Sequence, residues 1–269
     1  DCKELSEPYR PGKLREMSFA NIIGMVKEYR SLYGFYSDDL VGDYKRTIAR
    51  LQKEQRPAIE QQFSSFGNVL YSELHDFLNH GHEWIAAYDE SLASVHGLDF
   101  TDLICGVHRL FQDPVVRERW RSRYNYISVD EMQDTGVLEY KVLEMLWEGN
   151  HVLLCGDYFQ TIYEWRGSDP FRLLKQFDAD FKPLKIIFYE NYRSNWTLFT
   201  MAFKTLQNMF PDLVGSIYTE LPRANSERKG KPVLIKGCKN SYLEGRYIYE
   251  AICALPKDAN IGVLVRDNK

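Results

Sequence analysis

The sequence lacks the marks of several protein classes. Its cysteines form no C-x-x-C pair and no regular framework, which indicates reduced thiols rather than a zinc site or a disulfide scaffold: Cys2, Cys105, Cys155, Cys238 and Cys253. The six histidines form no ligand pattern either. No apolar run is long enough to cross a membrane and no signal peptide is recognisable, so we expect a cytoplasmic location.

The chain also lacks a strong charge of either sign. Its 269 residues carry a net charge of -4, which excludes a generally basic protein that binds polyanions through its whole surface. A local groove with aromatic side chains could still bind a nucleic-acid strand. Hydrophobic residues make up 44% and charged residues 27%, as in folded proteins, and the length suits one large domain or two ordinary ones.

Helical spacing of apolar residues dominates the first part of the chain. It predicts a helix from Ser18 to about Phe35 and a charged, helix-rich region over residues 38–95. A further helix should begin near Leu98, and Asp113-Pro114 should separate it from the next. The region 38–95 is therefore expected to be a small helical subdomain.

Short β-branched runs follow. The strand candidates are Tyr126–Val129, His151–Cys155 and Lys185–Tyr189, and a helix over Val137–Trp147 separates the first two. Alternation of strand and helix predicts an α/β fold with a parallel sheet. Later segments predict a helix from Asn195 to about Met209, an extended run at Val233–Lys236, a helix near Leu243–Leu255 and a strand at Ile261–Val265.

The first candidate site lies where residues 126–129 end in Asp130 and Glu131. A carboxylate at the end of a buried strand can hold Mg²⁺ through water. A neighbouring glutamate can orient or deprotonate the water that attacks a γ-phosphate. The alternative is a solvated strand end, because such acidic pairs are common.

A second string spans Gly156 to Gly167. Gln160 could sense a γ-phosphate by hydrogen bonding, and Tyr163 and Trp165, next to Arg166, suit stacking on nucleic-acid bases. The alternative is that the two rings belong to the core. A third string contains Tyr192 and Arg193, and arginine can stabilise charge in phosphoryl transfer, although a lone arginine is usually a surface residue.

These strings, in this order, resemble superfamily 1 DNA helicases of the UvrD/Rep type. Residues 129–135 resemble the Walker B motif of that family, residues 156–167 its motif III, and residues 191–194 its motif IV. Leu98–Leu103 resembles the helix that precedes Walker B, Ile261–Arg266 a strand of the second motor domain and, weakly, Ser18-Phe19 an earlier motif. Met132 and the pair Tyr158-Phe159 depart from the usual pattern.

The resemblance implies roles for individual residues. Asp130 would coordinate Mg²⁺, Glu131 would be the catalytic base, and Gln160 would contact the γ-phosphate of ATP. Arg193 would be an arginine finger and Tyr192 would stack on adenine. Single-stranded DNA would contact the remaining candidates, Tyr163, Trp165 and Arg166.

The resemblance also implies a fold of RecA-like P-loop NTPase motor domains, with parallel sheets, flanking helices and an inserted helical subdomain. The first motor domain would comprise residues 1–24 and 97–183, the helical subdomain residues 25–96, and the second motor domain would begin at residue 184. The implied cofactors are ATP and Mg²⁺. The implied partners are single-stranded DNA, DNA duplex junctions and a nuclease or repair protein.

A P-loop of the form G-x-x-x-x-G-K-[ST] is absent. The two Gly-Lys pairs, Gly12-Lys13 and Gly230-Lys231, lack the first glycine and the hydroxyl residue. We therefore expect part of an ATP-dependent DNA helicase or translocase whose P-loop and late motifs lie outside these residues, and a chain that is inactive alone. The alternatives are a degenerate motor that binds single-stranded DNA or supports a nuclease, and an unrelated α/β ATPase.

Overall fold

The structure is a computed structural model, and it describes residues 16–63, 71–161, 170–218, 220, 222–224, 230 and 233–264. The contacts divide the chain into two compact units, Asp1–Leu184 and Lys185–Lys269. Each unit is described by itself. The division of the chain into motor domains and an inserted subdomain stays a prediction.

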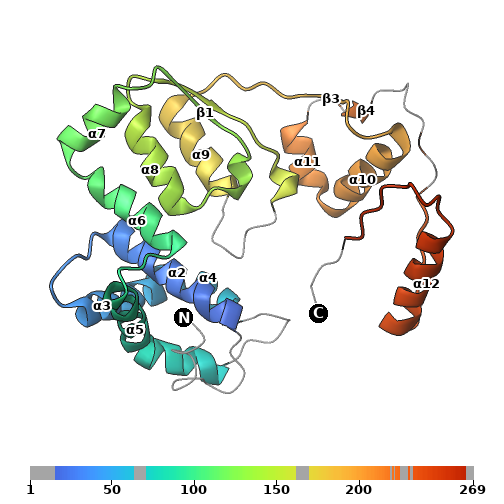
Figure 1. Cartoon of the computed structure of the whole chain (residues 1–269). Coiled ribbons are helices and arrows are strands. Elements are labelled where there is room, and N and C mark those ends of the chain that lie inside the picture. Colours follow the sequence, from blue (N-terminus) through green and yellow to red (C-terminus); the bar gives the residue numbers. More distant parts are fainter. Residues whose placement is uncertain are drawn as a thin grey trace. The chain divides into compact units, whose positions relative to one another are not determined.

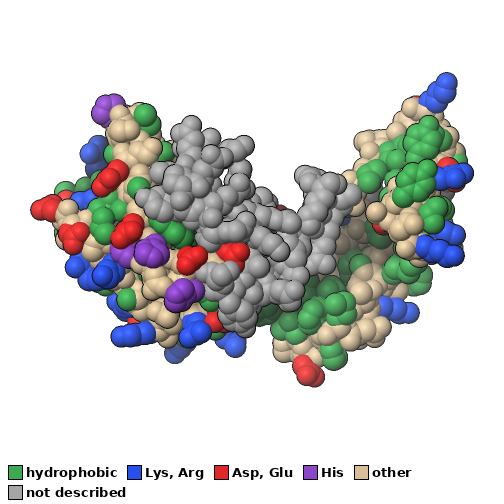
Figure 2. Space-filling view, turned by 90° about the horizontal axis from the view of Figure 1, so that it is seen from below, with side chains coloured by type: hydrophobic (Ala, Val, Ile, Leu, Met, Phe, Trp, Pro, Cys, Tyr) green, Lys and Arg blue, Asp and Glu red, His purple; other side chains and the backbone are tan. Residues whose placement is uncertain are grey.

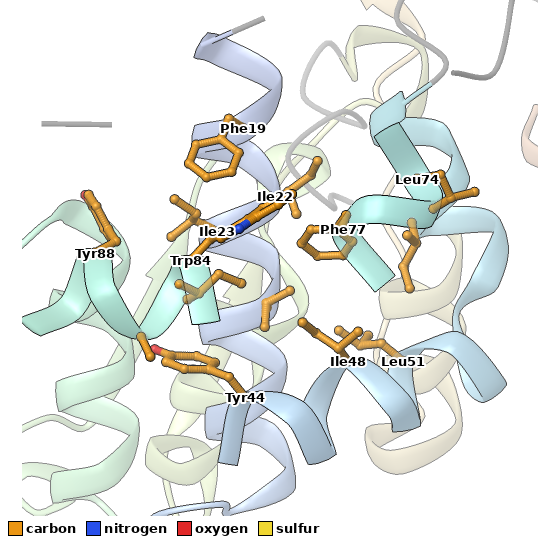
Figure 3. Close-up of a cluster of buried hydrophobic side chains, with 14 of the residues drawn as sticks. Phe19, Ile22, Ile23, Tyr44, Ile48, Leu51, Leu74, Phe77, Trp84 and Tyr88 are labelled. Carbon is orange, nitrogen blue, oxygen red and sulfur yellow. The ribbon is translucent and has the colours of Figure 1, made fainter. Parts of the chain in front are cut away.

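Four helices build the start of the first unit (Figure 1): α2 (Glu16–Tyr33), α3 (Leu40–Glu54), α4 (Arg56–Phe63) and α5 (Tyr71–Ser94). Their apolar faces meet in one buried cluster, in which Ile48 and Leu51 of α3 lie on the side of Phe77 of α5 and Tyr44 lies on the side of Tyr88 (Figure 3). The helical spacing of these residues is what lets each helix present one apolar face to the others. The helices predicted for this region are confirmed.

Two shorter helices follow, α6 (Phe100–Leu110) and α7 (Pro114–Arg121). Asp99 and Asp102 form a capping box at the start of α6, where each side chain accepts a hydrogen bond from the other residue's backbone N–H. Asp113 caps α7 without such a return bond: its side chain accepts from the amides of Val115 and Val116, and Pro114 lies in the first turn. The predicted break at Asp113-Pro114 is therefore confirmed, with a capping mechanism behind it.

A buried lysine ties three of these helices together. Lys27 of α2 is 4% exposed, and its Nζ lies 2.9 Å from Asp89 of α5, 2.8 Å from Asp99 and 2.5 Å from Asp102. Burial lowers the pKa of Lys27. The charge of Asp89 and the hydrogen bonds to the three acids raise it by more, so the net pKa lies above its usual value. Asp99 and Asp102 thus have a structural role here.

In the described part of the first unit, the sheet has two parallel strands, β1 (Tyr126–Val129) and β2 (His151–Leu154), joined through α8 (Val137–Trp147). The predicted parallel α/β arrangement is confirmed. Ile127, Val129, Val152 and Leu154 pack against a buried cluster built mainly from α8 and α9 (Pro170–Phe181). The alternate side chains lie on the other face, where Tyr126 and Leu153 are exposed.

The second unit contains α10 (Trp196–Met209), α11 (Pro211–Ile217), α12 (Ser241–Cys253) and the two-residue parallel strands β3 (Glu190–Asn191) and β4 (Arg223–Ala224). The predicted helices at 196–209 and near 243–255 are confirmed. The predicted strand Lys185–Tyr189 is wrong: pairing begins only at Glu190, after one hydrogen bond from the Arg223 amide to the Tyr189 carbonyl. Within the described residues the run has no neighbouring strand along its length, and Ile186 and Phe188 are exposed.

The same reason applies to two other extended runs. Residues 233–236 and 261–264 form no strand, and Val265, the last residue of the predicted strand Ile261–Val265, lies outside the described residues. Hydrophobic side chains gather on the surface of this unit (Figure 2). Among the described residues, no helix is both long and apolar enough to span a lipid bilayer.

Candidate functional site

The candidate site lies at the carboxyl ends of β1 and β2. Because the two strands are parallel and adjacent, the residues that follow Val129 and Leu154 meet at one edge of the sheet. The pairing continues beyond the strands: the Cys155 amide donates to the Val129 carbonyl at 2.8 Å, and the Met132 amide donates to the Cys155 carbonyl at 2.9 Å. In open α/β sheets, this edge is where ligands bind.

Asp130 and Glu131 occupy the first two positions after β1, and both side chains are exposed. Asp130 Oδ1 accepts a hydrogen bond from the Glu131 amide at 2.9 Å. Glu131 has a left-handed backbone with φ of 51°, which is unusual for a residue other than glycine. Buried Met132 anchors the next turn, η1 (Met132–Asp134), so the backbone turns sharply between the two acids and the core.

Gln133 joins the two strand ends. It is 2% exposed, its Nε2 donates to Glu131 Oε2 at 2.6 Å, and its Oε1 accepts from the Asp157 amide at 3.0 Å. Among the described residues this side chain bridges the loop after β1 and the loop after β2. The sequence placed Gln133 next to a candidate acid pair but did not assign it a role.

Gln160 completes a chain of hydrogen bonds. Asp157 accepts from the Phe159 amide at 3.0 Å and so caps the short helix η2 (Tyr158–Gln160). Its other oxygen accepts from Gln160 Nε2 at 2.9 Å. Hydrogen bonds therefore run without a break from Glu131 through Gln133 and Asp157 to Gln160.

Tyr192 and Arg193 belong to the second unit. Asn191 Oδ1 accepts from the amides of Arg193 at 3.1 Å and Ser194 at 2.7 Å, which forms a tight turn directly after β3. The Tyr192 hydroxyl donates to Glu190, and this hydrogen bond and the charge of Glu190 raise the pKa of Tyr192. The Tyr192 ring is exposed.

The expected site residues thus fall into three groups. The first unit brings Asp130, Glu131 and Gln160 together at one sheet edge. The second unit places Tyr192 and Arg193 in one turn. The DNA-binding candidates Tyr163, Trp165 and Arg166 lie outside the described residues.

The donor set at the sheet edge fits Mg²⁺ better than a metal that needs a protein cage. The described residues contain no group of three or more His, Cys, Asp or Glu arranged to hold a metal ion. Magnesium commonly uses one or two carboxylates and completes its shell with water and substrate phosphates. One oxygen of Asp130 accepts a backbone hydrogen bond, and the exposed carboxylate can still take water or a metal ion.

Comparison with known proteins gives this edge its context. Residues 13–182 match the model of the UvrD/REP helicase N-terminal domain, so the chain belongs to that family. Membership implies a RecA-like helicase fold, and the small parallel sheet with its helices agrees with it.

Individual proteins similar to this chain are also named as DNA helicases. The chain is 31% identical over 187 residues to a probable DNA helicase II homolog of Mycoplasma capricolum, covering 67% of this chain and 25% of the relative. It is 32% identical over 175 residues to DNA helicase II of Haemophilus influenzae, covering 63% and 23%. It is 33% identical over 176 residues to ATP-dependent DNA helicase Rep of Buchnera aphidicola, covering 64% and 26%.

The chain therefore spans about a quarter of the length of these curated relatives. The names of the relatives agree with the expected helicase family. They lend no support to the expected nuclease partner.

Proposed function

We propose that this chain is part of an ATP-dependent DNA helicase that couples ATP hydrolysis to movement along single-stranded DNA and to duplex unwinding. The observation that carries the proposal is the hydrogen-bond chain from Glu131 to Gln160 at the carboxyl ends of β1 and β2. It supports one arrangement in which an acid pair and a polar sensor face the same ligand. The helicase names of the relatives favour hydrolysis over a degenerate motor.

Asp130 is the proposed magnesium ligand. The exposed carboxylate directly follows Val129, the last residue of β1. The Cys155 amide donates a hydrogen bond to the Val129 carbonyl, so the sheet defines the position of Asp130. A magnesium ion bound with the nucleotide supplies positive charge that neutralises the phosphate oxygens in phosphoryl transfer. Asp130 would hold it mainly through water.

Glu131 is the proposed base and Gln160 the proposed sensor. Glu131 accepts from Gln133, and this contact fixes a carboxylate whose backbone already turns through an uncommon conformation. Such strain at a candidate site supports a functional role. Gln160, held by Asp157, carries an amide that can bond to a terminal phosphate oxygen.

Two residues of the second unit are also proposed to contact the nucleotide. Arg193 would stabilise negative charge on the transferred phosphoryl group, and the exposed ring of Tyr192 would stack on adenine. Residues 25–96, from the second half of α2 through α5, would form the accessory subdomain inserted in the first motor domain. Tyr163, Trp165 and Arg166 would meet single-stranded DNA.

ATP hydrolysis by the full-length protein tests the central proposal. Hydrolysis should require Mg²⁺ and should rise when single-stranded DNA is added. Glu131→Gln should retain ATP binding and lose turnover by at least about 100-fold, because a general base contributes about that much or more. Glu83→Gln on the exposed face of α5 is the matched control. Turnover that survives Glu131→Gln would refute the base assignment.

DNA binding tests the other end of the proposal. Trp165→Ala should weaken binding of single-stranded DNA by about 1–3 kcal/mol if the ring stacks on a base. Trp120→Ala on α7 is the control, since that ring packs against Arg123. Equal affinity of the Trp165 variant and the parent would make Trp165 a core residue instead.

A further inference from the structure

We infer that Gln133 is a positioning residue that holds the carboxylate of Glu131 and links it to the segment that carries Gln160. The inference rests on the proposed function, because it assigns Gln133 a part in the same hydrolysis. Its basis is geometric: one buried side chain bonds at 2.6 Å to the candidate base and at 3.0 Å to the loop after β2.

The two contacts determine which end of the amide faces which partner. The Asp157 backbone N–H can only donate, so it must face the amide oxygen of Gln133. The amide nitrogen then faces Glu131, whose carboxylate can only accept. Both hydrogen bonds are satisfied in this one orientation, and a buried amide flipped the other way would lose both.

Few side chains could replace glutamine here. Glutamate has nearly the same shape and can accept from Asp157, but at neutral pH it cannot donate to Glu131 and adds a second negative charge beside it. Alanine makes neither contact. The position therefore needs a group that donates at one end and accepts at the other.

Gly156 makes room for the bridge. A Cβ atom built on Gly156 would lie 2.6 Å from Gln133 Oε1 and 3.3 Å from the backbone nitrogens of Met132 and Gln133. Any side chain at residue 156 would therefore displace the Gln133 amide or the backbone beside it. The glycine of the second sequence string is thus required for close approach of the two loops.

This arrangement connects sensing to catalysis. A shift of the Asp157–Gln160 segment on contact with the terminal phosphate would move the Asp157 amide, to which Gln133 is bonded. Gln133 would pass that shift to Glu131 through its other end. The carboxylate would then reach its working position only when the sensor loop has engaged its ligand.

Two substitutions at residue 133 separate the two hydrogen bonds. In the full-length protein, Gln133→Glu and Gln133→Ala should each lower kcat for ATP by about 10- to 100-fold, with KM within about twofold of the parent value, because displacement of a reacting group by about 1 Å costs about that much. In this 269-residue chain, hydrogen exchange of the Asp157 amide should stay slow for Gln133→Glu, which keeps an acceptor, and should quicken for Gln133→Ala.

Gln176→Glu is the matched control. Gln176 Nε2 also donates to a glutamate, Glu144, at 3.4 Å, but it joins α9 to α8 away from the strand ends. Its substitution by glutamate also places two acids together, beside Lys141, which pairs with Glu144, and should leave kcat and Asp157 exchange unchanged. A drop in kcat equal to that of Gln133→Glu would mean that any such change of charge disturbs the protein.

Gly156→Ala tests the bridge without altering either partner. It should lower kcat and quicken Asp157 exchange, as Gln133→Ala does, and the combination of the two should lower kcat little further. Gly136→Ala is the control, because a Cβ there would meet no atom closer than 3.6 Å.

The outcomes separate the two proposals. If the parent protein hydrolyses ATP and Gln133→Glu keeps the parent kcat, the inference fails and the proposed function stands. If the parent protein does not hydrolyse ATP, the proposed function fails and takes the positioning role with it. Slow Asp157 exchange in Gln133→Ala would overturn the bridge itself, whatever the activity.

Discussion

The helices of the first unit bury many hydrophobic side chains, whereas the described segments of the second unit bury few. Helices α2 to α5 close a core of aromatic and aliphatic side chains that includes Tyr44, Leu51 and Phe77. In the described part of the second unit, the buried hydrophobic residues are Val214 and Ala224. A larger set there remains exposed: Ile186, Phe188, Leu234, Ile235, Tyr242, Tyr249 and Leu264.

The difference follows from how helices and strands acquire partners. A helix satisfies its backbone hydrogen bonds within itself, so a few adjacent helices need only match their apolar faces. A strand depends on neighbouring strands that are often distant in sequence. Where those neighbours are absent, extended runs such as residues 185–189 keep exposed apolar side chains.

The sheet of the first unit lies between these two cases. One face, with Ile127 and Val152, packs against α8 and α9, while Tyr126 and Leu153 stand on an exposed face. Parallel sheets are normally covered on both faces. Within the described residues, the candidate site therefore lies at the edge of a sheet that helices cover on one face.

Loss of a central ring should have the largest effect on this comparison. Phe77→Ala should lower the free energy of unfolding of the first unit by about 3–5 kcal/mol, because it removes a buried aromatic side chain and leaves a cavity. Urea unfolding followed by circular dichroism measures the change. Phe100→Ala is the control, since that ring is 90% exposed. Equal losses from the two variants would contradict the closed core.

Removal of the buried cation should come next. Lys27→Met should lower the free energy of unfolding by about 3 kcal/mol, because Asp89, Asp99 and Asp102 lose their shared partner. We place the loss at the low end because these acids keep part of their contact with solvent. Urea unfolding at pH 7 measures it, with exposed Lys53→Met as the control. An unchanged midpoint would show that the three ion pairs contribute nothing net.

How far the sequence predicts the fold depends on the range of the signals. The limits of β1 and the approximate limits of α8 agree with the prediction, because a β-branched run and a helical period are local signals. The start of α7 followed from Asp113-Pro114. The apolar spacing does not predict helices α9 and α11, although both begin with a proline, which favours the first turn of a helix.

The site was predictable in part for the same reason. Asp130 and Glu131 stand directly after a strand, so their position at the sheet edge followed from the pattern. The role of Gln133 did not, because it depends on the approach of Asp157, 24 residues away. Lys185–Tyr189 failed as a strand because strand propensity cannot supply a neighbour.

A pH experiment tests the burial of the helical region. Burial and, to a smaller extent, the nearby charge of Glu139 together raise the pKa of Glu28 on α2 from 4.5 to about 8. The folded protein therefore binds this proton more tightly than the unfolded chain. The contribution of Glu28 to stability is complete below about pH 4.5 and is lost as the pH rises through about 8.

Glu28→Gln should remove that loss. The variant should gain about 1–3 kcal/mol over the parent protein between pH 5 and pH 9, because the neutral amide has no proton to lose. Urea unfolding at several pH values measures the difference. Exposed Glu90→Gln is the control and should follow the parent curve. Parallel curves for Glu28→Gln and the parent would mean that Glu28 is charged and solvated in the folded state.

The smallest effect belongs to the second unit. Phe188 is 85% exposed and lies in the run that forms no strand, so Phe188→Ala should change the free energy of unfolding by less than about 0.5 kcal/mol. Urea unfolding of this chain, compared with Phe77→Ala, measures it. A loss of several kcal/mol would show that Phe188 is buried in solution, and that residues 185–189 pair as a strand and close a core in the second unit as well.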